Sequence, residues 1–286
     1  MHWIVRAMRT VLLIGLIAMA GPGPAIAQLP AVTAHKGNIF LYWGYNRSGY
    51  SWSDIHFDGP GYDLTLRHVE ATDRPIPFDP KLYFDPRTLT LPQYNYRLGW
   101  FFQDRWSISL GMDHMKYVVV QGQQVRMDGF VDASRSVPHA AAEGSHEVTL
   151  DPDLLTYEHS DGLNLLSLDV DHYDPLWQSR NGRHALHVFE GVHAGPVIPR
   201  TDVRLFGEGI NNRFHLAGYG VGAQVGLHLG FFRHGFLRVI GKAGWIDLPS
   251  VLTTGTAEDG ASQHFWFGQY AVVLGGQFRL HRSVDR

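Results

Sequence analysis

The sequence predicts an all-β fold, specifically an antiparallel up-and-down transmembrane β-barrel of eight strands. Three observations lead to this prediction. Several segments alternate strictly between apolar and polar residues, the clearest of them is about twice the ordinary strand length of about 5–6 residues, and the connections alternate between long and short. Side chains in a strand point alternately to opposite faces, so each such segment has one apolar face. Ten strands is the other even number that the pattern leaves open.

The segment Leu216–Phe231 shows the alternation most clearly. One face is entirely apolar, and the other carries glycine, glutamine and histidine. A strand tilted across a bilayer needs about 9–11 residues in the hydrocarbon, and this segment is long enough. The alternative is a soluble lipocalin-like barrel, which buries its apolar face and exposes its polar face. Small residues on the polar face suit a narrow lumen, which favours the membrane barrel.

Eight segments carry the alternation and are predicted to be strands. They are Ile39–Asn46, Tyr94–Phe101, Trp106–Asp113, Leu166–Asp171, His184–Gly195, Leu216–Phe231, Leu237–Trp245 and Trp266–Leu280. The long connections are Arg47–Pro92, Val119–Gly162, Pro196–Arg213 and Asp247–Ser262, and the short turns are Gln103–Arg105, Ser179–Gly182 and Arg233–Gly235. Within the first long connection, Tyr62–Val69 is predicted to form a hairpin that stands clear of the membrane. Short periplasmic turns and long extracellular loops are typical of transmembrane barrels, which close because a sheet edge cannot face lipid.

The N-terminus predicts export. Basic residues precede an apolar run at Val11–Ala20, and Ala25–Ala27 has the small-x-small form of a cleavage site. Residues 1–27 are therefore expected to be a cleaved signal peptide, and residues 28–286 a single barrel domain in the cell outer membrane. The absence of cysteine in an exported chain suits an envelope protein without disulfides, and the net charge of −3 gives no reason to expect nucleic acid as a partner.

Alternation also predicts which side chains face the lumen. The inward set is Arg97, Asp113, Asp169, Asp171, Gln224, His228, Arg238 and Lys242. An eight-stranded barrel is just wide enough for side chains to fill, and charges in a low-dielectric interior must pair. We therefore expect Arg97, Arg238 and Lys242 to meet Asp113, Asp169 or Asp171 in an ion-pair network that plugs the lumen. The alternative is a narrow conduit for protons or very small solutes.

Glu190 does not fit the alternation. It shares the lipid-facing set of its strand with apolar neighbours, whereas His187 and His193 lie on the other face. A carboxylate in lipid is costly. A bulge could turn Glu190 inward, it could lie at the membrane interface, or it could belong to a site.

No cofactor and no metal site are predicted. Asp113-His114 and Asp171-His172 carry ligand-type residues near opposite ends of their strands, but no spacing matches a closed metal site.

The pattern resembles the small eight-stranded outer-membrane β-barrels of Gram-negative bacteria, over nearly all of the mature chain. Glu158–Asn164 and Pro199–Asp202 are also similar to stretches in an uncharacterised outer-membrane barrel family. This resemblance implies outer-membrane lipids and lipopolysaccharide as partners, and the barrel-assembly machinery during insertion. It supplies no activity and no extracellular ligand.

The string Glu158–Gly162 is similar to the His-x-Ser-Asn-Gly region of outer-membrane phospholipase A and to a pattern in lipid A deacylases. Those barrels use a serine that a histidine activates. Here His159 and Ser160 are adjacent, so they would point to opposite faces of a strand, and His159 and Asp161 would share the inner face. The preferred function is a non-enzymatic structural or surface-binding barrel. The alternative is a lipid hydrolase, with His159, Ser160, Asp161 and Glu190 as weak candidates.

Overall fold

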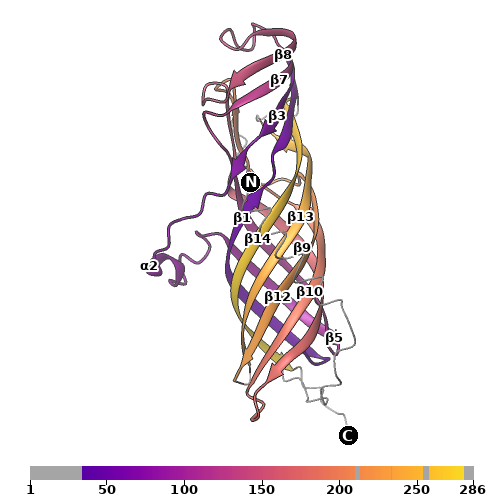
Figure 1. The fold of residues 1–286 in the computed structure, drawn as a ribbon. Coiled ribbons are helices and arrows are strands. Elements are labelled where there is room, and N and C mark those ends of the chain that lie inside the picture. The colour runs from indigo at the N-terminus through magenta and orange to yellow at the C-terminus, as the bar shows by residue number, and fades with distance from the viewer. Residues whose placement is uncertain (1–33, 210–212, 233, 254–257, 280–286) are drawn as a thin grey trace.

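The computed structural model describes residues 34–209, 213–232, 234–253 and 258–279, so the predicted signal peptide lies outside the described residues. Its main feature is a closed ring of eight antiparallel strands in the order β1-β5-β6-β9-β10-β12-β13-β14, closed by pairing between β14 and β1 (Figure 1). The strands are β1 (Asn38–Tyr50), β5 (Tyr94–Gln103), β6 (Trp106–Val119), β9 (Leu155–Gln178), β10 (His184–Val197), β12 (Gly218–Phe231), β13 (Gly235–Leu252) and β14 (Gly260–Arg279). The predicted antiparallel up-and-down barrel of eight strands is confirmed.

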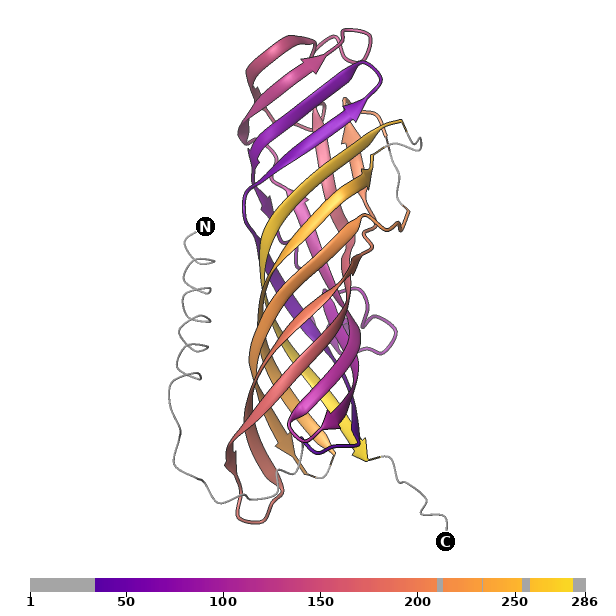
Figure 2. The same cartoon turned by 90° about the vertical axis from the view of Figure 1, so that its right-hand side faces the viewer.

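The short connections β5–β6, β9–β10 and β12–β13 lie at one end of the ring, which we call the turn end, and the long connections lie at the opposite loop end (Figure 2). Several strands continue toward the loop end beyond their predicted limits. The predicted loops Val119–Gly162 and Asp247–Ser262 are therefore too long, because β9 begins at Leu155, β13 ends at Leu252 and β14 begins at Gly260. The predicted loop Pro196–Arg213 contains the short strand β11 (Asp202–Leu205), which pairs with β9.

Four further strands of the same sheet rise above the ring at the loop end. The strands β2 (Ser53–Gly59), β3 (Tyr62–Val69), β7 (Gln124–Val131) and β8 (Ala141–Thr149) continue in that order from the upper part of β14 (Figure 2). We call these four strands the upper sheet. The predicted hairpin at Tyr62–Val69 is β3, paired with β2. Two small elements follow it, namely β4 (Ala71–Thr72), which pairs with β6, and the single-turn helix α2 (Pro80–Tyr83). Among the described residues no helix is long and apolar enough to cross a membrane.

The interior changes character along the barrel axis. At the loop end the ring and the upper sheet enclose an apolar core, which we call the upper core. Tyr117 and Phe265 are fully buried there, in one cluster with residues of β2, β3 and β7. Toward the turn end, a second and smaller cluster of buried aromatic residues closes the barrel, with Phe40 and Phe236 among its members. Buried charged residues lie between these two layers. The sequence pattern did not reveal the upper core, because on the loop side of these buried charges the apolar side chains point inward instead of outward.

The outer surface of the ring carries a belt of exposed apolar side chains from all eight strands. Those exposed by 44–62 % include Leu41, Leu98, Leu110, Leu168, Val192, Val221, Leu227, Val239, Val272 and Leu274. Aromatic residues border the belt on both sides. The row toward the loop end includes Trp43, Tyr45, Tyr94, Tyr96, Tyr219, Trp245 and Trp266, and the row toward the turn end includes Trp100, Trp106, Trp177 and Phe278. Charges inside and an apolar band with aromatic borders outside are the arrangement of a transmembrane barrel.

Candidate functional site

Two cations and two carboxylates meet at the centre of the barrel. Arg97 donates from Nε to Asp169 Oδ2 at 3.0 Å and from Nη2 to Asp113 Oδ2 at 2.6 Å. The Nζ atom of Lys242 lies 2.9 Å from Asp113 Oδ2 and 3.6 Å from Asp169 Oδ2. These four side chains come from β5, β6, β9 and β13, and each is at most 3 % exposed. Their charges balance, so the group forms a neutral layer across the lumen, which we call the charged layer.

Polar side chains extend the charged layer. Ser167 accepts a hydrogen bond from Arg97 Nη2 at 3.0 Å, and Gln224 Nε2 donates to Asp171 Oδ1 at 2.5 Å. Asp171, which the sequence grouped with the ion pairs, thus has an amide partner. Room for the arginine comes from Gly111, directly across from it in β6, where a Cβ atom would lie only 2.7 Å from Arg97 Cδ. A side chain at that position would clash with Arg97 and, more closely, with the backbone carbonyl of Tyr96.

Arg238 departs from the sequence prediction. It was expected to meet an aspartate, but it lies among the aromatic side chains nearer the turn end and donates from Nε to His228 Nδ1 at 2.9 Å. Its guanidinium carbon is 4.5–5.5 Å from the centres of five rings, those of Phe40, Tyr42, Tyr173, Phe189 and Phe236. A cation over the face of an aromatic ring is attracted by the ring quadrupole, more strongly where water is excluded. Aromatic faces therefore take the place of the expected carboxylate.

These rings pack closely because of glycine on the facing strand. A Cβ atom at Gly226 of β12 would lie 2.6 Å from the Phe189 ring, so this ring can occupy its place only above a glycine. This gives one reason for the glycine-lined inner face of the strand Gly218–Phe231. The inward set assigned from the sequence contains no tyrosine or phenylalanine, so the part of these rings in holding a cation emerges only from the closed ring.

The three adjacent hydrolase candidates are not brought together. His159 is fully buried in the upper core, where its Nδ1 lies 3.0 Å from Thr201 Oγ1. Ser160 lies on the opposite face of β9, as the alternation predicted. Asp161 was expected beside His159 on the inner face, but it is exposed and lies 3.4 Å from the guanidinium of Arg200. The reason is an irregularity in β9, because pairing with β6 breaks between His159 and Leu163, where Gly162 has a φ of +134°.

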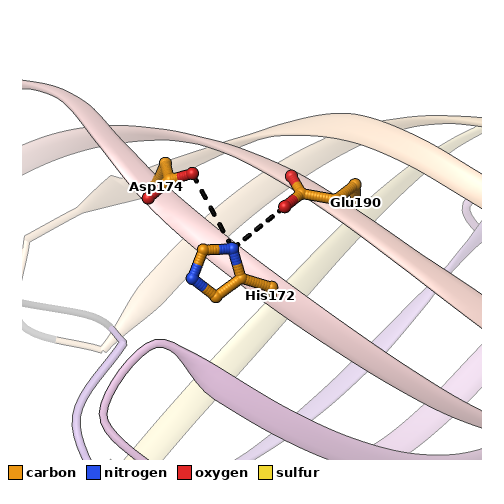
Figure 3. A group of neighbouring side chains, drawn as sticks. All are labelled: His172, Asp174 and Glu190. Atoms are coloured by element: carbon orange, nitrogen blue, oxygen red, sulfur yellow. Dashed lines mark hydrogen bonds and ion pairs between the residues drawn. The ribbon is translucent and has the colours of Figure 1, made fainter. Parts of the chain in front are cut away.

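Glu190 stays on the outer face, and the pairing of β9 with β10 is regular around it. Of the three possibilities open from the sequence, this regular pairing is inconsistent with the bulge. Its carboxylate lies 2.9 Å from His172 Nδ1, and Asp174 lies 3.7 Å from the same nitrogen (Figure 3). Trp106, from the aromatic row at the turn end, packs against the His172 ring with centres 4.7 Å apart. The carboxylate thus lies in a cluster of polar and aromatic side chains on the outer face of the ring.

Hydrogen bonds and ion pairs hold this outer cluster of His172, Asp174 and Glu190 together. Ligand atoms of His172, Asp174 and Glu190 lie within 4.8 Å of one another, which is compatible with a metal ion. However, Arg105 lies 2.9 Å from Asp174 Oδ1 and 3.3 Å from His172 Nε2. If that nitrogen accepts from Arg105, the neutral ring carries its proton on Nδ1 and donates it to Glu190. Arg105 therefore already supplies a positive charge beside one of the two carboxylates.

Charged pairs also tie the upper sheet together. Arg67 of β3 lies 2.9 Å from Asp54 of β2 and 2.8 Å from Asp128 of β7. Hydrogen bonds from the Ser145 hydroxyl and the Arg67 guanidinium hold the pKa of Asp128 below its ordinary value. Ser145 belongs to β8, so these contacts link all four strands.

Comparisons with known proteins found similar solved structures. No protein-family model matches it, and neither does any curated protein. It is similar to the outer membrane protein OprG from Pseudomonas aeruginosa, with 12 % identity over 86 % of this chain and 99 % of that chain, and a TM-score of 0.40. It is similar to outer membrane protein AlkL, with 10 % identity over 93 % and 100 % of the two chains and a TM-score of 0.36.

A third similar structure is Ail, the attachment invasion locus protein of Yersinia pestis, in complex with the heparin analogue sucrose octasulfate. The identity is 8 % over 85 % of this chain and 99 % of that chain, with a TM-score of 0.29. All three are small outer-membrane β-barrel proteins, the class that the sequence resembles. The likeness concerns the fold and assigns no activity.

Proposed function

We propose that this protein is an integral outer-membrane β-barrel with a closed lumen, and that it acts as a non-enzymatic scaffold presenting its upper sheet for binding at the cell surface. One observation carries the proposal, namely that the interior is filled along its length. The aromatic cluster with Arg238, the charged layer and the apolar upper core follow one another from the turn end to the loop end. A barrel of eight strands leaves room for side chains and little else.

The outer face supports membrane insertion. Monomeric soluble proteins rarely expose a contiguous apolar patch of more than a few hundred Å², whereas here the exposed belt involves every strand of the ring. In this proposal the belt contacts outer-membrane lipids and lipopolysaccharide, and the barrel-assembly machinery inserts the chain. The turn end faces the periplasm and the upper sheet faces the medium.

The upper sheet supports the surface role. Recognition commonly uses loops and edges that a rigid scaffold positions. The four strands are held by the upper core below and by the Arg67 contacts across them, and β8 forms the free end of the strand order. The outer side of β8 is largely exposed and polar, with Glu143 and Ser145 among its exposed residues.

The closed lumen predicts an absence of pore activity. Purified protein should fractionate with outer membranes, migrate differently on gels before and after boiling, and give no stable channel of porin size in a planar bilayer. A large stable conductance would contradict the closed lumen. It would favour a function in solute transport over a function in surface binding. A soluble protein without a heat-dependent shift would contradict the membrane assignment itself.

The apolar belt predicts a position-dependent cost for charge. Leu274 is 60 % exposed, and it pairs with Trp43 of β1 and Leu237 of β13. Replacing it with arginine should cost about 2–4 kcal/mol if the site lies near the bilayer midplane, seen as a lower folded fraction in vesicles. Val137, in the connection between β7 and β8, is 78 % exposed and provides the control, because Val137→Arg should have no effect. Equal tolerance of the two substitutions would argue against a lipid-facing belt.

A further inference from the structure

The segment between β4 and β5 leaves the ring sideways, and α2 lies outside the barrel wall (Figure 1). Two phenylalanines flank the helix and are unusually exposed, Phe78 by 65 % and Phe84 by 71 %. Their rings lie 6.3 Å apart, and Phe78 also packs against Tyr83 at 5.1 Å. We call Phe78 and Phe84 the aromatic knob.

Tyr83 fixes the knob against the outer face of β1. Its own side chain is 4 % exposed, and its ring lies 4.7 Å from that of Tyr45. The Tyr45 hydroxyl donates to the Tyr83 carbonyl, and Arg47 Nη2 donates to the Tyr83 hydroxyl at 2.9 Å. The Tyr83 hydroxyl in turn donates to the Ile76 carbonyl at 2.7 Å, which closes the segment on itself. The position of the knob relative to the barrel is therefore set by three side-chain contacts.

The contacts of Tyr83 with β1 show where the knob lies along the barrel axis. Along the outer face of β1 the side chains change from Leu41 through Trp43 and Tyr45 to Arg47. This succession from aliphatic to aromatic to charged is the pattern of a membrane–water interface. The knob is attached to the last two of these residues, so it lies at the border of the apolar belt on the loop side.

The side chains of this segment suit the boundary between lipid headgroups and acyl chains. Two exposed phenylalanines gain free energy by leaving water for the acyl boundary, whereas basic side chains favour the headgroup layer. Lys81, which is exposed and lies between Phe78 and Phe84 in the sequence, supplies such a basic side chain. We propose that the aromatic knob enters the lipid leaflet on the loop side and anchors the segment between β4 and β5 to the membrane surface. This inference rests on the proposed function, because it requires the ring to span the membrane.

The absence of native cysteine makes the test direct, since any introduced cysteine can be labelled uniquely. Single-cysteine variants Phe78→Cys, Phe84→Cys and Lys81→Cys would each carry an environment-sensitive NBD fluorophore in the full chain. Lys81→Cys leaves both phenylalanines in place and so reports on the unmodified knob. Each protein would be reconstituted at low density in phosphatidylcholine vesicles, with and without a lipid bearing a doxyl quencher close to its headgroup.

Two further labelled positions calibrate the result. Leu98→Cys lies in the apolar belt, and Val137→Cys lies at the far end of the upper sheet. All three probes on the segment should shift their emission to shorter wavelength and lose much of their fluorescence to the quencher, whereas the probe at position 137 should do neither. If position 98 is quenched but positions 78, 81 and 84 behave like 137, the knob does not meet lipid, while the membrane barrel stands. If the probe at position 98 shows neither the shift to shorter wavelength nor quenching, the membrane barrel itself fails.

Discussion

Replacing Arg97 with alanine is expected to destabilise the barrel by about 3–5 kcal/mol, the typical cost of breaking a buried ion pair by removing one partner. The cost comes from the two buried carboxylates that Arg97 contacts. Asp113 and Asp169 are at most 1 % exposed, and the variant would leave Lys242 alone to balance both carboxylates. The temperature at which the unheated gel band converts to the unfolded band should fall, or small-ion leakage through reconstituted vesicles should rise.

Arg87→Ala is the matched control. Arg87 forms an ion pair with Asp85, but its side chain is 87 % exposed, so its removal should leave the transition temperature unchanged. The double variant Arg97→Ala with Asp113→Asn removes one of the uncompensated charges and should recover part of the lost stability. If Arg97→Ala alters neither stability nor leakage, the charged layer does not support the barrel.

Replacing Phe265 with alanine is expected to have an effect of similar size, about 3–5 kcal/mol, because it opens a cavity in a packed core. Phe265 is 1 % exposed, and its ring lies 5.5 Å from Tyr50 and 4.8 Å from Tyr117. The loss of stability should be greatest at the loop end of the barrel, where Phe265 is buried. Protease cleavage within the upper sheet should therefore become faster under native conditions.

The neighbouring residue gives an internal comparison. Trp266 follows in β14 but points outward and is 54 % exposed. Trp266→Ala should change membrane partitioning more than protease resistance of the upper sheet. If the two variants were equally susceptible to the protease, the enclosed apolar core at the loop end would be called into question.

The sequence by itself determined the ring and the direction of its side chains. Between the two aromatic rows, lipid lies outside and packed side chains lie inside, so alternation with a period of two has a constant meaning on every strand. For this reason the eight segments could be recognised, and Arg97, Asp113 and Lys242 could be assigned to the interior. The same rule kept Glu190 on the outer face, although its partner His172 could not be read from a single strand.

Tertiary structure alone decided what lies beyond the belt and which groups meet. Above the charged layer the apolar side chains face inward, so the alternation has the opposite meaning there. The lengths of β9, β13 and β14 were underestimated for this reason. The irregular pairing at Gly162 turned Asp161 outward. Arg238 contacts aromatic rings instead of a carboxylate. Tyr83 holds the aromatic knob against β1. These outcomes depend on contacts between strands distant in sequence, which the order of residues along one strand does not specify.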